Sequence, residues 1–340
     1  MGRALVVGGT GQIGRAVVPA LTADGWQVDV LTRDPARHGP WLAGAGATPV
    51  PGDRRDATAL VDALRGGVDL LVDVVAFDDR DATPFLDRPG AVGAAVVVSS
   101  AAVYVDPDGH GFETERFAAF DGPVGEDAGT VAPGRGSYAR GKVALEHAWR
   151  GSPVPTTVLR PAAVHGPWSA QPREWLLVRR ALDGRDVRLL AHDGRSRFAT
   201  TAAAAVGALV AAAAAEPADR VLNVADADAP TVAEIARAVD AALGVTSRVV
   251  GLPGPPRGDL GRTPWSVPHD LVLGTDRARA LLPAPPVPYA QAVVPAVRWL
   301  AARGRDATYP GFARLEGGGD LFDYAAEDAW LAQHDDGRDL

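Results

Sequence analysis

Tyr138 and Lys142 are the residues of this chain best suited to proton-transfer chemistry. Lys142 is the one lysine among 34 lysine and arginine residues, and it follows Tyr138 by four positions where an apolar helical pattern begins. Residues i and i+4 of a helix lie on one face, so the phenol and the ammonium should point the same way. A nearby cation lowers the pKa of a phenol, and an ammonium, unlike a guanidinium, can pass on a proton. The spacing therefore predicts a catalytic pair; the alternative is a solvated surface lysine.

A glycine-rich turn near the N-terminus has the pattern of a dinucleotide site. The apolar run Ala4–Val7 leads directly into three glycines at a spacing of three, and a helical pattern follows to Ala23. In such a strand–turn–helix context the glycines allow a tight turn, close approach of the pyrophosphate and close helix packing. The helix N-terminus adds free N–H groups and a partial positive charge. The candidate residues are Gly8, Thr10, Gly11, Gln12, Ile13 and Gly14.

The second apolar run, Gln27–Leu31, decides which dinucleotide is expected. NAD sites carry an acid at the end of this strand, which binds the ribose 2′-hydroxyl. Here neutral Thr32 follows, and then Arg33, which can pair with a 2′-phosphate. Asp34 is the competing acid, but its position before a proline is also typical of a helix start. We therefore expect NADP(H) as the cofactor, with NAD(H) as the alternative.

Continuous apolar runs alternate with helical patterns as far as residue 224, which indicates a parallel sheet covered on both faces. In such sheets ligands bind at the carboxyl ends of the strands. Asp53, at one of these ends, could accept a hydrogen bond from an adenine amino group. We predict an α/β fold, a Rossmann-type doubly wound parallel sheet with a smaller C-terminal substrate-binding lobe. The Rossmann domain should cover residues 1–166, with 196–224 returning to it; the lobe and tail should cover 167–195 and 225–340.

The segment 105–136 is a long irregular connection rich in glycine, aspartate and proline. It carries Phe112, Phe117 and Phe120. Long loops of this kind are often lids or binding loops. The three rings suggest a substrate with apolar or aromatic surface, although they may equally pack the loop onto the core.

Taken in order, these motifs resemble the extended branch of the short-chain dehydrogenase/reductase superfamily, which holds epimerases, dehydratases and ketoreductases. The glycine turn matches the cofactor glycines, Ser100 the catalytic serine, and Tyr138 and Lys142 the catalytic pair. Arg160-Pro161 and the following His165-Gly166-Pro167 match a stretch near the nicotinamide. The fourth strand departs from the family pattern, because it ends Asp73-Val74-Val75-Ala76 where relatives usually have His-x-Ala-Ala.

The resemblance implies roles for further residues. Ser100 would hydrogen-bond the substrate and Lys142 would also hold the nicotinamide ribose. The further cofactor contacts it implies are Val75, Ala76, Tyr138, Pro161 and Val164. The substrate contacts it implies are Ser100, Tyr104, His165 and Arg197.

Composition narrows the remaining classes of function. A net charge of −8 argues against a nucleic-acid surface. There are no cysteines, and the histidines are scattered, so we expect no metal site. The longest uncharged apolar run, Ala202–Ala215, is too short to span a membrane. We expect a cytoplasmic, bacterial protein with a small-molecule substrate; a homodimer is compatible with the sequence but not required by it.

These observations predict an NADP(H)-dependent oxidoreductase, a ketoreductase or dehydrogenase that transfers a hydride with a Ser100–Tyr138–Lys142 triad. One alternative is an NAD-dependent nucleotide-sugar epimerase or dehydratase that retains its cofactor. A further alternative is a non-catalytic NADP-binding regulator or scaffold, because folds of this kind are reused.

Overall fold

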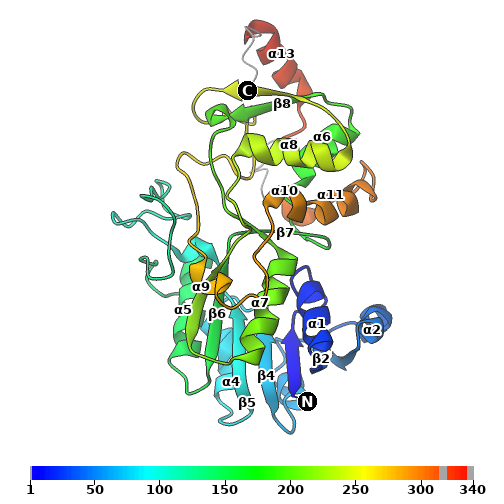
Figure 1. Cartoon of the computed structure of the whole chain (residues 1–340), viewed down its shortest axis with the longest axis vertical. Helices are drawn as coiled ribbons and strands as arrows, with labels where there is room; N and C mark the ends of the chain where they lie inside the picture. The colour runs from blue at the N-terminus through cyan, green and yellow to red at the C-terminus, as the bar shows by residue number, and fades with distance from the viewer. Residues whose placement is uncertain (1, 314–319, 335–340) are drawn as a thin grey trace.

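The computed structural model describes residues 2–313 and 320–334 of the chain. Its centre is a seven-stranded parallel sheet with the strand order β10-β6-β5-β4-β1-β2-β3. The strands are β1 (Arg3–Val7), β2 (Gln27–Thr32), β3 (Ala47–Pro51), β4 (Val68–Asp73), β5 (Val92–Val98), β6 (Thr156–Pro161) and β10 (Arg220–Val224). The predicted Rossmann-type sheet is confirmed, and it forms the lower half of the molecule in Figure 1.

Helices cover both faces of this sheet, because successive side chains of a strand point to opposite faces. Val6 of β1 belongs to a buried cluster with one set of helices, and Leu5 to a cluster with the other set. The first face is covered by α1 (Gly14–Ala23) and α7 (Ala203–Ala215), with α2 (Pro35–Gly44) beside β3 and α9 (Asp276–Arg279) beside β10. The second face is covered by α3 (Ala57–Ala63), α4 (Asp79–Leu86) and α5 (Tyr138–Arg150).

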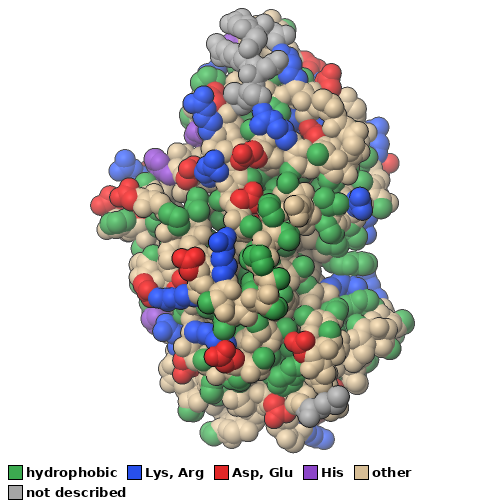
Figure 2. All heavy atoms as spheres, viewed as in Figure 1, with side chains coloured by type: hydrophobic (Ala, Val, Ile, Leu, Met, Phe, Trp, Pro, Cys, Tyr) green, Lys and Arg blue, Asp and Glu red, His purple; other side chains and the backbone are tan. Residues whose placement is uncertain are grey.

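A second lobe lies above the carboxyl ends of the strands (Figure 1). Its core joins α6, α8, α10 and α11 to the 105–136 segment. The elements are the parallel pairs β7 (Ala163–His165) with β9 (Thr200–Ala202) and β8 (Val187–Ala191) with β11 (Arg248–Leu252), and the helices α6 (Trp175–Leu182), α8 (Val232–Leu243), α10 (Tyr289–Ala292), α11 (Val294–Ala301), α12 (Pro310–Ala313) and α13 (Tyr324–His334). In Figure 2 the outline is indented between the lobes, and acidic and basic side chains are interspersed on the visible face.

Several elements differ from the sequence-based expectation. Strand β9 is short and begins only at Thr200, because the preceding Arg197 and Phe198 make isolated bridges to other segments. Helix α4 was not expected, and its charged sequence is stabilised by a capping box between Asp78 and Asp81. Strand β11 was also not expected; a proline-rich segment follows it directly.

The segment 196–224, which was expected to return to the Rossmann domain, contains β10 and α7. Strand β10 and helix α7 pack with the main sheet, while β8, α6, α8 and α11 lie in the second lobe. Residues 314–319 and 335–340 of the expected lobe and tail lie outside the described residues. No helix within the described ranges is long and apolar enough to cross a bilayer, and these ranges contain no group of three or more potential metal-ligating side chains.

Candidate active site

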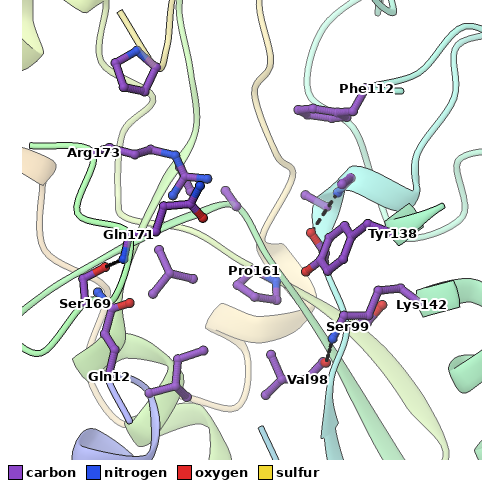
Figure 3. Close-up of a pocket in the computed structure, with 18 of the residues that line it drawn as sticks. Gln12, Val98, Ser99, Phe112, Tyr138, Lys142, Pro161, Ser169, Gln171 and Arg173 are labelled. Atoms are coloured by element: carbon purple, nitrogen blue, oxygen red, sulfur yellow. Dashed lines mark hydrogen bonds between the residues drawn. The ribbon is translucent and has the colours of Figure 1, made fainter. Parts of the chain in front are cut away.

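A cavity of about 790 Å³ opens where β1, β4, β5 and β6 end and the second lobe begins. One wall comes from the end of β5, the start of α5 and the 105–136 segment, whose Phe112 lies on the side of Tyr138. The opposite wall comes from the segment after β7, and Gln12 of the glycine turn lies on this side. Figure 3 shows Tyr138 and Lys142 on one side of this space and Gln171 and Arg173 on the other.

The glycine turn has the shape that a pyrophosphate requires. Gly8 adopts a φ of +87°, which disfavours other residues. A Cβ added at Gly14 would lie 2.3 Å from the Gly9 Cα, so this glycine allows the helix to pack against the turn. A Cβ at Gly11 would meet only the Gly8 oxygen, at 3.6 Å, and would otherwise project into open space that a ligand can use. The N-cap residue of α1, Ile13, supplies no side-chain cap, which leaves this helix end suited to an anion.

Four of the six predicted turn residues, Gly8, Gly11, Gln12 and Ile13, line the cavity. The Gln12 amide nitrogen donates to the Gly166 carbonyl at 3.2 Å and so ties the turn to the segment after β7. Thr10 and Gly14 lie behind the lining, and the Thr10 carbonyl accepts a hydrogen bond from Arg15 Nε.

Asp73, the last residue of β4, holds the loop that follows this strand. Its fully buried carboxylate accepts hydrogen bonds from the Val75 and Ala76 N–H groups, at 3.1 and 2.9 Å, and from Arg54 at 2.8 Å. The loop is therefore held from within. Val75 lines the cavity, whereas Ala76 is buried and presents its carbonyl to Lys142.

Tyr138 is the first residue of α5, and its ring is accessible from the cavity. The Glu113 carboxylate accepts hydrogen bonds from the Tyr138 and Ala139 N–H groups and so anchors the start of this helix. Burial raises the pKa of the Tyr138 phenol; a hydrogen bond with Ser100 and the charge of Arg173 act in the opposite direction. Ser100 also caps the short helix after β5, accepting a hydrogen bond from the Ala102 N–H at 3.1 Å.

Lys142 is buried beneath Tyr138, with its ammonium nitrogen 5.5 Å from the centre of the phenol ring. This nitrogen donates to the Ala76 carbonyl at 2.6 Å and to the Val98 carbonyl at 2.8 Å; Figure 3 shows Lys142 beside Val98. Burial lowers the pKa of Lys142 to about 8, although the charges of Asp73 and Asp81 partly oppose this. We expected Lys142 to lower the pKa of Tyr138. Instead the pKa of the phenol is raised, because its burial outweighs the effects that lower it.

Three residues that the family resemblance placed at the substrate do not line the cavity. Tyr104 is fully buried and donates its hydroxyl to Asn223 at 2.6 Å. His165 is buried and lies 2.7 Å from Asp226 through Nε2. Arg197 is exposed and donates to the Ala229 carbonyl. The structure therefore gives these side chains roles in packing and bridging, away from the cavity.

The expected cofactor contacts at the far end of the sheet also lie outside the cavity. Arg33 is exposed at the end of β2. Asp34 caps α2 and accepts a hydrogen bond from the Arg37 N–H at 2.9 Å. Asp53 accepts a hydrogen bond from the Arg55 N–H. Pro161 and Val164, by contrast, line the cavity as expected.

A buried charge network supports the floor of the site and was not foreseen. Arg160 forms a bidentate ion pair with Glu146, at 3.0 and 2.6 Å. The same carboxylate accepts a hydrogen bond from the Ser99 hydroxyl at 2.5 Å. Bidentate pairs of this kind are geometrically specific. The network therefore fixes the end of β5 against α5 and β6, directly beneath Ser100 and Tyr138.

The residues of the opposite wall were missed as well, because nothing in their spacing marks them. Arg173 is one of many arginines, and Gln171 stands in no recognisable motif. Phe198 joins two phenylalanines of the 105–136 segment, Phe112 and Phe117, in the lining. Phe112 and Phe120 both pack against the core of the second lobe, but Phe120 does not line the cavity.

Comparison with known proteins adds information about the fold. The model of the NmrA-like family matches residues 2–82, which include the glycine turn but end before Ser100 and Tyr138. No curated protein sequence matches the chain.

Solved structures resemble most of the chain. UDP-N-acetylglucosamine 4-epimerase from Bacillus cereus has 19% identity and a TM-score of 0.66, with 89% of this chain and 100% of that chain covered. A putative epimerase from Burkholderia cenocepacia J2315 has 21% identity and a TM-score of 0.68, covering 88% and 98%. dTDP-glucose 4,6-dehydratase from Bacillus anthracis, solved with NAD, has 16% identity and a TM-score of 0.64, covering 88% and 96%. These structures share the fold of this chain over most of its length.

Proposed function

We propose that this protein is an NADP(H)-dependent oxidoreductase that reduces a carbonyl substrate to an alcohol. The observation that carries the proposal is the convergence of four features on one cavity. The glycine turn, Ser100, Tyr138 and Lys142 come from residues up to 134 positions apart in the sequence, and all line this space. A structural role for each would not require them to meet.

The choice of NADP(H) rests on the end of β2. Asp34, the one acid near this end that could bind a ribose 2′-hydroxyl, already caps α2. Thr32 is buried and neutral, while Arg33 is exposed and free to meet a 2′-phosphate. A guanidinium suits a phosphate better than a hydroxyl. These contacts support NADP(H) over NAD(H).

The side chains of the cavity can carry out the proton chemistry of a reduction. The bound nicotinamide would supply the hydride to the carbonyl carbon. Ser100 would donate a hydrogen bond to the carbonyl oxygen, and Tyr138 would give that oxygen its proton, which completes the alcohol. The raised pKa of Tyr138 keeps the phenol protonated at neutral pH, as a proton donor must be. Lys142, with a pKa of about 8, is the neighbouring group that can return a proton.

The alternative is an NAD-dependent epimerase or dehydratase that keeps its cofactor. The solved structures with the same fold favour it, since they include two enzymes that act on nucleotide sugars by their names. Such an enzyme has no net redox change and would retain NAD through purification. A non-catalytic role is less well supported, because all three members of the triad are present at one cavity.

The experiment is to purify the protein, record its absorbance spectrum and identify any nucleotide released on denaturation. We expect protein largely free of cofactor that oxidises added NADPH when given carbonyl compounds, and NADH much more slowly. Stoichiometric NAD that survives gel filtration would overturn the proposal in favour of the epimerase alternative.

A further inference from the structure

Arg173 is the charged side chain of the cavity that has no partner. Three charged residues line this space. Glu113 is held by two backbone N–H groups, and Lys142 donates to two backbone carbonyls. Within the described part of the chain, the Arg173 guanidinium makes neither a hydrogen bond nor a salt bridge. An enclosed cation without a partner is costly, which suggests that a ligand provides the missing negative charge.

The position of Arg173 is fixed by the backbone around it. It precedes α6, and its carbonyl accepts a hydrogen bond from the Leu176 N–H. Figure 3 shows its guanidinium pointing into the cavity beside the Gln171 side chain, across from Tyr138. Burial lowers the pKa of Arg173, and the charge of Glu174, the next residue, partly opposes this without forming an ion pair with the guanidinium.

Apart from Glu113 and Ser169, the remaining residues that face the substrate space are mostly apolar. Phe112 packs edge-on against Phe117 and Phe198, with ring centres 5.2 and 6.2 Å apart. Val267 and Leu271 extend the same surface. A group placed between Tyr138 and Arg173 would therefore touch rings and aliphatic side chains along its length.

From this arrangement we infer that the substrate is a carbonyl compound with an apolar, aromatic-sized body and a single carboxylate, which binds Arg173 and Gln171 while the carbonyl faces Ser100 and Tyr138. The inference rests on the proposed function for the carbonyl end. A carboxylate matches one guanidinium bidentately. A nucleotide diphosphate carries more charge than one free arginine can balance, and the three charged lining residues include no second free cation.

The test uses a matched set of small probes. These are 4-formylbenzoate, its methyl ester, 4-formylphenyl phosphate and UDP. Their affinities would be measured by calorimetry with and without NADP⁺, and the turnover of the three aldehydes by NADPH oxidation. We expect 4-formylbenzoate to bind at least tenfold more tightly than the ester and the two phosphate compounds.

Arg173→Gln should weaken 4-formylbenzoate about 10- to 100-fold, the range for a hydrogen bond to a charged group, and leave the ester unchanged. Arg173→Lys should lose less, because it keeps the charge without the bidentate geometry. Arg197→Gln is the matched control, since this arginine is exposed outside the cavity, and it should behave like the wild type. Thermal unfolding would show whether each variant is folded. If Arg173→Gln does not fold, the comparison is made with Arg173→Lys.

Several results would overturn the inference. They are equal binding of the acid and its ester, tighter binding of UDP or the phosphate, no binding of any probe, or unchanged affinity for the acid in the folded Arg173 variants. Failure of the proposed function looks different. In that case 4-formylbenzoate would still bind in an Arg173-dependent way, but NADPH would not be oxidised.

Discussion

The two walls of the cavity differ in how their polar groups are satisfied. On the cofactor side, Lys142, Ser100 and the Asp73 carboxylate all hydrogen-bond to the backbone. On the substrate side, Arg173 and Gln171 point into the space without side-chain partners among the described residues. Both walls therefore carry polar groups. The three groups on the cofactor side each have a partner within the protein, although the buried Asp73 Oδ2 atom has none among the described residues, whereas the Arg173 and Gln171 side chains have none at all there.

This difference suggests two roles: groups with partners inside the protein hold a fixed position, and groups without partners recognise the ligand. Hydrogen bonds within the protein fix the groups that would move protons, so their geometry does not depend on the substrate. Groups without partners break no hydrogen bond within the protein when a ligand of the right charge binds. A ligand without that charge binds more weakly, because it leaves these groups unpaired. Substitutions on the two walls should accordingly affect different parameters.

The largest effect should come from Tyr138→Phe, which removes the proton that the cofactor wall would deliver. We expect kcat to fall about 10²- to 10⁴-fold, the usual contribution of general acid–base catalysis, with little change in stability. Tyr104→Phe is the matched control, because it leaves the Asn223 oxygen without its donor. That variant should lose about 1–3 kcal/mol of unfolding free energy and keep its kcat. Steady-state kinetics and urea unfolding measure both, and equal kcat values in the two variants would remove Tyr138 from the chemistry.

Lys142→Met tests the burial of the ammonium through pH. Folding lowers the pKa of Lys142 from 10.5 to about 8, so between these values the unfolded chain binds the proton and the folded protein does not. The stability of the wild type should therefore rise with pH across this window, relative to the variant, by a few kcal/mol at most. Urea unfolding of both proteins from pH 7 to 10.5 checks this. If the difference in unfolding free energy between the two proteins does not change with pH, burial does not lower the pKa of Lys142. We also expect Lys142→Met to lose most of its turnover.

Arg33→Ala tests cofactor choice outside the cavity. We expect NADP(H) binding to weaken by about 1.5–3 kcal/mol, the range for a hydrogen bond to a charged group, and NAD(H) binding to change little. Arg65→Ala serves as the control, because Arg65 is exposed and pairs with Asp62. Fluorescence titration with both cofactors gives the result. Equal losses for NADP(H) and NAD(H) would exclude Arg33 from phosphate recognition.

The smallest effect should come from the apolar rings that line the cavity. Phe112→Leu removes part of one ring, which should lower kcat/KM about threefold to tenfold, equally for 4-formylbenzoate and its methyl ester. Phe120→Leu, which alters a ring packed on the core, should lower the melting temperature and leave kcat/KM unchanged. If Phe112→Leu lowers kcat/KM more for 4-formylbenzoate than for its methyl ester, Phe112 acts through Arg173 and not by direct contact with the substrate.

Much of the cofactor wall could be predicted because its signals are local. The three glycines stand within seven consecutive residues, and each has a backbone role that a short segment specifies by itself. The Tyr138–Lys142 pair is one helical turn, so spacing alone places both side chains on one face. The strands were recognisable for the same reason, since buried parallel strands are continuous apolar runs.

The substrate wall could not be predicted, because it depends on contacts between distant segments. Arg173 becomes distinctive only when the second lobe folds over the strand ends and leaves its guanidinium enclosed without a partner. Tyr104, His165 and Arg197 had the right residue types, yet packing turned the first two into the core and the third toward solvent. The sequence by itself determined the sheet, the glycine turn and the placement of Tyr138 and Lys142 on one helical turn. Burial and pairing, which depend on every neighbouring element, decided which polar side chains remain available to a ligand.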